Sequence, residues 1–196
     1  MPAIQITTVP TSPDVFKAST DLIKAAPGHQ SSFYGLKVED EKIGYFVSVW
    51  DTHEHLAANP HHAAIIKPLA GNPQWHIDAL NINITTDPLP ALSSPAVEFA
   101  VFTLQAPDEA TATQNQKRIT ELLKALGSGL DLAAAAHPPC FWGQSGEDEN
   151  KFVMIVGWES VEAHIEFAMA GNLGEIVREI KTFARVSISH SNMTKD

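Results

Sequence analysis

The sequence predicts an α+β protein that contains two copies of one βαββαβ unit. Its 196 residues are enough for two small domains of about 100 residues each. The strongest observation is an internal repeat, in which residue types recur at a constant separation of 108 positions (141 − 33 for the first matched pair). The clearest matches are Phe33-Tyr34-Gly35 with Phe141-Trp142-Gly143, and Trp50-Asp51-Thr52 with Trp158-Glu159-Ser160. Both halves also carry the same order of predicted elements.

The first half begins with β-favouring residues, and a helix start follows, with Ser12 as N-cap and Pro13 at the first helical position. A polar turn, Glu39-Asp40-Glu41, separates two apolar runs and predicts a β-hairpin. Pro60 kinks or splits the second predicted helix, because proline lacks the N–H of the helical hydrogen bond. The expected elements are a strand at 3–8, a helix at 13–26, strands at 32–38 and 43–50, a helix at 52–69 and a strand at 75–85.

The second half repeats this order. Its first helix is predicted by an apolar stripe at helical spacing, formed by Ile119, Leu122, Leu123 and Leu126. The expected elements are a strand at 96–104, a helix at 108–126, strands at 140–144 and 151–158, a helix at 160–182 and a strand at 185–190. A proline-rich connector at 87–95 separates the two predicted units, which are 1–86 and 96–196.

The order βαββαβ is that of the ferredoxin-like unit, whose antiparallel sheet carries helices on one face only. The other apolar face must be buried, so we expect the two sheets to pack face to face as an α+β barrel with a cavity between them. Strand alternation places Phe46, Ser48 and Trp50 on one face, which we expect to line that cavity. The side chains expected to bind a flat, apolar ligand there are Tyr34, Trp50, His76, Trp142 and Trp158.

Composition excludes several classes of protein. The 13 Lys and Arg against 23 Asp and Glu give a formal net charge of −10, and the cations are scattered, which argues against a nucleic-acid partner. A single cysteine, Cys140, supports neither a disulfide scaffold nor a thiolate zinc site. The start of the chain does not resemble a signal peptide, and no apolar run reaches the roughly 20 residues of a membrane span. We therefore expect a cytoplasmic protein without a membrane partner.

Three segments carry a resemblance to a known family: Tyr45–His55, Phe152–His164, and Leu56–Ala63 with its Pro-x-His pattern. Through them the chain resembles the dimeric α/β-barrel superfamily, in particular the antibiotic-biosynthesis-monooxygenase-like proteins. That superfamily includes cofactor-free monooxygenases, polyketide cyclases, haem-degrading enzymes and muconolactone isomerases, so the resemblance implies a fold and leaves the function open. Tandem two-unit chains of this type are similar to fungal proteins of specialised metabolism.

Histidines are concentrated in the first half of the sequence. The repeat places apolar residues at the equivalent positions of the second half, so the titratable groups are not duplicated with the scaffold. Histidine accepts and donates protons near neutral pH, and we therefore expect one catalytic site, in the first half. The five histidines are His53, His55, His61, His62 and His76, and their equivalents are Val161, Ala163, Met169, Ala170 and Ala184.

His62 is the preferred general base. By resemblance it matches the histidine that follows Pro-x in the cyclases of the superfamily, where it acts as a base at the mouth of the barrel. The tyrosine that those cyclases carry one helical turn earlier is replaced by Leu56 in this chain. His55 and His61 are the alternative catalytic residues.

The expected function is that of a cofactor-independent small-molecule enzyme, of the monooxygenase or cyclase type, with an aromatic or polyketide-like substrate. The alternative is a non-catalytic ligand-binding or stress-response barrel. No motif indicates a metal site, and an imidazole-bound Zn, Cu or Ni ion is the metal alternative; haem ranks below it. We expect no cofactor, and a homodimer remains open.

Overall fold

The computed structural model describes residues 2–10, 16, 20–59, 78–171 and 173–196. The chain divides into two compact units. The first unit comprises residues 1–85 together with Ser191–Asp196, and the second comprises residues 86–190. The last six residues, which we had placed with the second unit, thus group with the first.

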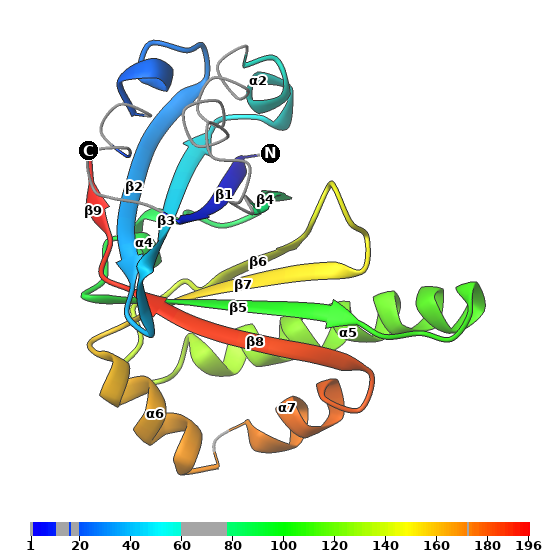
Figure 1. Ribbon diagram of the computed structural model, residues 1–196. Helices are drawn as coiled ribbons and strands as arrows, with labels where there is room; N and C mark the ends of the chain where they lie inside the picture. The colour runs from blue at the N-terminus through cyan, green and yellow to red at the C-terminus, as the bar shows by residue number, and fades with distance from the viewer. Residues whose placement is uncertain (1, 11–15, 17–19, 60–77, 172) are drawn as a thin grey trace. The chain divides into compact units, whose positions relative to one another are not determined.

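The first unit contains a four-stranded antiparallel sheet in the order β4-β1-β3-β2 (Figure 1). Thr194–Lys195 (β9), from the end of the chain, adds to this sheet by pairing with β2. The described helical residues of this unit are 16, 20–23 and α2. Residues 24–26, 58 and 59 of the predicted helices are not helical, and residues 13–15, 17–19 and 60–69 lie outside the described residues. The elements are β1 (Ala3–Pro10), β2 (His29–Lys37), β3 (Asp40–Trp50), α2 (His53–Ala57) and β4 (Asp78–Asn83).

The second unit has the same strand order, β8-β5-β7-β6, and its long helices cover one face of the sheet (Figure 1). None of the described helices is long and apolar enough to span a membrane. The elements are α4 (Leu89–Leu92), β5 (Ala96–Leu104), α5 (Glu109–Leu130), β6 (Phe141–Gln144), β7 (Lys151–Trp158), α6 (Val161–Met169), α7 (Gly174–Ile180) and β8 (Ala184–Ser191). Each unit is therefore an α+β unit with ferredoxin-like strand order, as predicted.

The pairing register confirms the repeat residue by residue. Phe33 lies opposite Val47 in the first sheet, and Phe141 lies opposite Ile155 in the second, so both partners are displaced by 108 positions. The helix starts repeat as well. Thr52 caps α2 by accepting a hydrogen bond from the backbone N–H of His55, and Ser160 caps α6 in the same way.

Three predicted elements of the second half differ in the structure. The single helix predicted at 160–182 is divided into α6 and α7, because Gly171 and Leu173 adopt left-handed backbone angles, with φ of 75° and 58°. The connector at 87–95 contains α4, whose Ala91 carbonyl accepts a hydrogen bond from the Ser94 hydroxyl. The helix predicted to end at 126 continues to Leu130, so α5 is one turn longer.

The face of the sheet that carries the tryptophans lies beneath the helices of its own unit. Trp50 and Phe46 pack with Phe16 and Leu56 in the core of the first unit. Met154, Val156 and Trp158 pack in the second unit with Ile119, Leu122, Leu123 and Leu126 of α5. Helices of the same unit cover this face, contrary to the prediction that it lines a cavity between the two sheets. Strand alternation identifies which residues share a face, but not which face the helices cover.

Gly28 should tolerate no side chain. Its φ of +80° is left-handed, and an added Cβ would collide with the Asp51 carboxylate and the His55 ring. We expect Gly28→Ala to lower the free energy of unfolding by about 1–3 kcal/mol, measured by urea denaturation. Gly174→Ala is the matched control, because a Cβ there meets no atom within 4 Å, and its effect should stay within about 0.5 kcal/mol.

Candidate functional site

The structure describes only part of the predicted histidine site in the first unit. His61, His62 and His76 lie outside the described residues, so the assignment of His62 as base stays a prediction. His53 is exposed. The His55 side chain is 44% exposed, and its Nδ1 pairs with the Asp51 carboxylate on the surface of α2.

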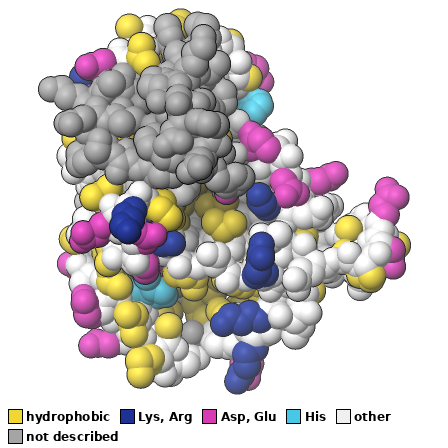
Figure 2. Space-filling model, viewed as in Figure 1, with side chains coloured by type: hydrophobic (Ala, Val, Ile, Leu, Met, Phe, Trp, Pro, Cys, Tyr) yellow, Lys and Arg dark blue, Asp and Glu magenta, His cyan; other side chains and the backbone are white. Residues whose placement is uncertain are grey.

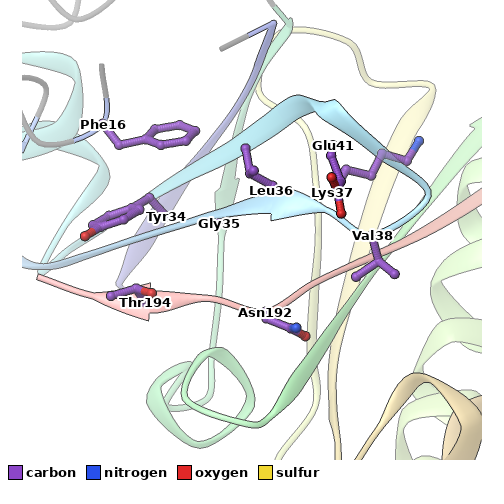
Figure 3. Close-up of a pocket in the computed structure, with 9 residues that line it drawn as sticks. All are labelled: Phe16, Tyr34, Gly35, Leu36, Lys37, Val38, Glu41, Asn192 and Thr194. Carbon is purple, nitrogen blue, oxygen red and sulfur yellow. The ribbon is translucent and has the colours of Figure 1, made fainter. Parts of the chain in front are cut away.

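The predicted ligand-binding aromatics fall in different places. Trp50 and Trp158 are fully buried core residues, and Trp142 packs against the core of the second unit. Tyr34 stacks on Phe16 with ring centroids 5.5 Å apart, and both rings line an open hollow of about 410 Å³ beside the β2–β3 hairpin (Figure 3). The polar side chains at the rim of this hollow include Lys37, Glu41 and Asn192, and they come from separate positions along the hairpin and the C-terminal segment.

A buried polar cluster occurs instead in the second unit, where it joins two strands and a helix. Glu98 is the one charged residue of β5, and its side chain is only 7% exposed. His164 lies on α6, one turn after the Ser160 cap, and His190 lies near the end of β8. Nδ1 of His164 is 2.8 Å from Nε2 of His190, and Nε2 of His164 is 3.6 Å from Oε2 of Glu98. The three side chains thus form a chain with His164 in the middle.

Trp158 fixes the geometry of this cluster. Its indole N–H donates a 2.8 Å hydrogen bond to Oε2 of Glu98, and this contact holds the carboxylate in place. The indole ring also stacks on the imidazole of His164, with centroids 5.1 Å apart and planes inclined by 29°. One buried aromatic side chain therefore positions both the acid and the central imidazole.

The surroundings of His164 favour its neutral form. Burial lowers the pKa of His164 below its usual value of 6.5, and the neighbouring His190 lowers it further, whereas the Glu98 carboxylate raises it. Nδ1 of His164 and Nε2 of His190 share one hydrogen bond, in which either ring can be the donor.

Two lowered histidine pKa values predict a loss of stability in acid. Burial also lowers the pKa of His29, so for both side chains the unfolded state binds the proton more readily. Stability should be fully present above pH 6.5 and should fall as the pH drops through the lowered folded-state values. We expect the melting temperature to decrease from pH 7.5 to 5.0, and less steeply in His164→Gln. An unchanged slope in that variant would contradict the buried neutral state, and the exposed His53→Gln is the control.

His164 lies on the wall of an apolar pocket of about 270 Å³. Glu98 and His164 supply the polar groups at one end of it. The remaining wall comes from β5, β7 and β8 and from helices α5, α6 and α7, so the pocket lies between the sheet and the helices of the second unit. Its apolar side chains include Phe102, Leu126, Leu130, Met154, Phe167 and Val177. An apolar pocket with a few convergent polar groups is typical of a small-molecule site.

Equivalent positions of the first unit carry no titratable group. Ala3 and Ala96 lie opposite the equivalent residues Trp50 and Trp158, so Gln5 corresponds to Glu98. The repeat places Leu56 at the position of His164 and Ile82 at that of His190, and both are buried apolar residues. The cluster of Glu98, His164 and His190 therefore occurs only in the second copy of the repeat, among the residues that the structure describes.

Sequence reasoning missed this cluster although two signals were present. One is the carboxylate of Glu98 within the otherwise apolar strand Ala-Val-Glu-Phe-Ala-Val-Phe. The other is the repeat itself, since the residue 108 positions after Leu56 is His164. The resemblance to the cyclases singled out Leu56 as the position of their tyrosine, but the equivalent position of the second half, His164, was not considered.

Glu98, His164 and His190 are also the group of possible metal ligands that the described residues bring together, with one ligand atom from each within 4.8 Å of the others. Two imidazoles and a carboxylate are ligands that Zn²⁺ accepts. However, His164 presents one ring nitrogen to His190 and the other to Glu98. Each ring nitrogen of His164 is thus directed at a neighbouring side chain, and a chelate would require one of these contacts to rearrange.

No protein-family model and no curated protein matches the chain. Solved structures do match. A candidate monooxygenase from Fusobacterium nucleatum superposes with a TM-score of 0.68 at 11% identity, covering 100% of this chain and 94% of that chain. An anthrone oxidase-like protein superposes with a TM-score of 0.67 at 14% identity, covering 98% of this chain and 93% of that chain. A candidate monooxygenase from Lactobacillus acidophilus superposes with a TM-score of 0.64 at 11% identity, covering 99% of this chain and 95% of that chain.

The fold is shared with these proteins. It is the ferredoxin-like α+β fold that the sequence predicted. At these identities the likeness concerns the fold, and the function must be argued from the side chains of this chain.

Proposed function

We propose that this chain is a cofactor-independent small-molecule enzyme of the monooxygenase or cyclase type, with its site in the helix-covered pocket of the second unit. The observation that carries the proposal is the imidazole of His164 on an apolar pocket wall, 3.6 Å from the buried carboxylate of Glu98. The names of the structural neighbours, two candidate monooxygenases and an anthrone oxidase-like protein, agree with this class. The substrate class is aromatic or polyketide-like, because the wall is apolar and largely aliphatic and aromatic.

The chemistry begins with a proton transfer. The imidazole of His164, which lines the pocket, accepts a proton from an activated carbon or a phenol of the bound molecule. The Glu98 carboxylate, 3.6 Å from Nε2, stabilises the positive charge of the imidazolium, while Trp158 keeps that carboxylate in position. The anion left on the substrate is delocalised over its ring system against the apolar wall of the pocket.

Two outcomes follow from the same anion. In oxygenation it reacts with O₂, and conversion of a CH₂ group to a carbonyl consumes one O₂ and releases one water. In cyclisation it attacks a carbonyl of the same molecule, and a new carbon–carbon bond forms. In both, His164 returns its proton to the product or to the released water.

Oxygen uptake with an acidic diaryl methylene compound tests the proposal. We expect purified protein to accelerate O₂ consumption by anthrone, a tricyclic compound with one activated CH₂, and to yield the corresponding quinone. A panel of poly-β-ketones, followed by mass spectrometry, tests the cyclase type. Binding of these compounds without turnover would support the alternative of a non-catalytic binding barrel, and lack of both binding and turnover would refute the pocket as a small-molecule site.

A further inference from the structure

The pocket of the second unit has two chemically different ends. Glu98 lies at one end of its β5 wall, and Phe102, four residues later on the same face, lies at the other. At about 3.3 Å per residue these positions are roughly 13 Å apart. Glu98 and His164 thus mark one end of an elongated pocket, and the space between the ends is apolar.

Lys181 lies at the opposite end from His164. It follows α7 directly and lines the pocket together with Val177, one helical turn before it. Two residues later, the Phe183 carbonyl accepts a 2.8 Å hydrogen bond from the Gln105 N–H, just beyond the end of β5. This bond places the turn that carries Lys181 beside the Phe102 end of the strand. His164, on α6, lies near the opposite end of β8 (Figure 1).

Lys181 is the one lysine or arginine among the described residues that line the pocket. It is exposed at the pocket rim, and no acidic side chain of the described part of the chain forms a salt bridge with it. In the lower half of the view in Figure 2, Lys and Arg side chains lie beside exposed hydrophobic side chains. In a protein with a net charge of −10, a cation placed over an apolar pocket is a local attraction for anions.

The position of Lys181 at a helix C-terminus offers another explanation, since a cation there interacts favourably with the helix dipole. Arg178 already serves that purpose, because it lies in the last turn of α7 and does not line the pocket. Arg178 contacts Glu175 through solvent-exposed atoms 3.9 Å apart. It is therefore a matched control for any effect of charge at this end of the helix.

We infer that the pocket selects elongated, apolar aromatic molecules that carry an anionic group at one end, and that Lys181 binds this group. The inference rests on the proposed function for the orientation of the substrate: the anionic end lies at Lys181, and the carbon or phenol that loses its proton lies at His164, on the order of 10 Å away. Carboxylated or otherwise acidic polycyclic aromatics fit this pattern. A neutral analogue binds the same apolar wall more weakly.

Two fluorescent dyes with one skeleton test the inference. Anilinonaphthalene sulfonate carries a sulfonate that N-phenyl-1-naphthylamine lacks, and both become fluorescent in apolar pockets. We expect Lys181→Met to weaken binding of the sulfonate dye by about three- to tenfold and to change binding of the neutral dye by less than about twofold. Lys181→Glu should have the larger effect, and 0.5 M NaCl should reduce the preference of the unmodified protein.

Controls assign the effect to the pocket. Arg178→Met should leave both affinities within about twofold, and Ala168→Trp, at an exposed position of the pocket wall, should weaken both dyes alike. If both dyes bind and Lys181→Met alters neither, or alters both equally, the inference is overturned while the proposed enzyme function stands. If neither dye binds, or if Ala168→Trp affects neither, the inference is overturned, and the proposed function is then decided by the turnover assays alone.

Discussion

Replacement of His164 by alanine is expected to lower turnover by about 10²–10⁴-fold, the usual contribution of a positioned general base. The variant loses the nitrogen that accepts the proton, and the Glu98 carboxylate loses the imidazolium that it stabilises. Because His164 touches the pocket, the loss should fall mainly on kcat and less on KM. The measurement is oxygen uptake, or product formation, with the compound that the unmodified protein turns over.

The pH dependence of the rate gives a second readout for His164. Only neutral imidazole accepts a proton, so the rate should rise with pH through the pKa of His164, and at lower pH than for an exposed histidine, since burial lowers that pKa. Ile165→Ala is the matched control, because Ile165 is the next residue of α6, is 47% exposed and does not line the pocket. Full activity in His164→Ala would refute the assignment and return attention to His55, His61, His62 and His76.

Replacement of Trp158 by alanine should be the most destabilising single change considered, at about 3–5 kcal/mol of unfolding free energy. The indole is fully buried in the core of the second unit, and its removal leaves a cavity beneath α5 and α6. It also removes the hydrogen-bond donor to Glu98 and the ring that stacks on His164. Urea denaturation followed by circular dichroism measures this change.

Trp158→Phe and Trp50→Phe separate the hydrogen bond from the packing. Both tryptophans are equally buried at equivalent positions, but the indole N–H of Trp50 donates to the hydroxyl of Ser48, while that of Trp158 donates to a carboxylate. Hydrogen bonds to charged groups are the stronger class. We expect Trp158→Phe to cost about 1–2 kcal/mol more than Trp50→Phe. Equal costs would indicate that Glu98 does not depend on this donor.

The order and pairing of the strands could be predicted because their signals are local and occur twice. Strand alternation, helix caps such as Thr52 and Ser160, and the 108-residue spacing each depend on short segments, and agreement between two copies removes most ambiguity. The division of α6 from α7 was missed although Gly171 and Gly174 flank it. Glycines inside a helical pattern are tolerated often enough that they do not by themselves end a helix.

The sequence by itself determined the α+β class, the duplicated βαββαβ order and the equivalence of Phe33 with Phe141. Tertiary structure decided which face of each sheet the helices cover, and with it the place of the candidate site. Glu98 is 60 residues from Trp158, and His164 is 26 residues from His190. Contacts between residues so far apart leave no periodic pattern in the sequence, because they depend on how α6 packs across β5 and β8. Burial then lowers the pKa of His164, which no count of histidines along the chain could reveal.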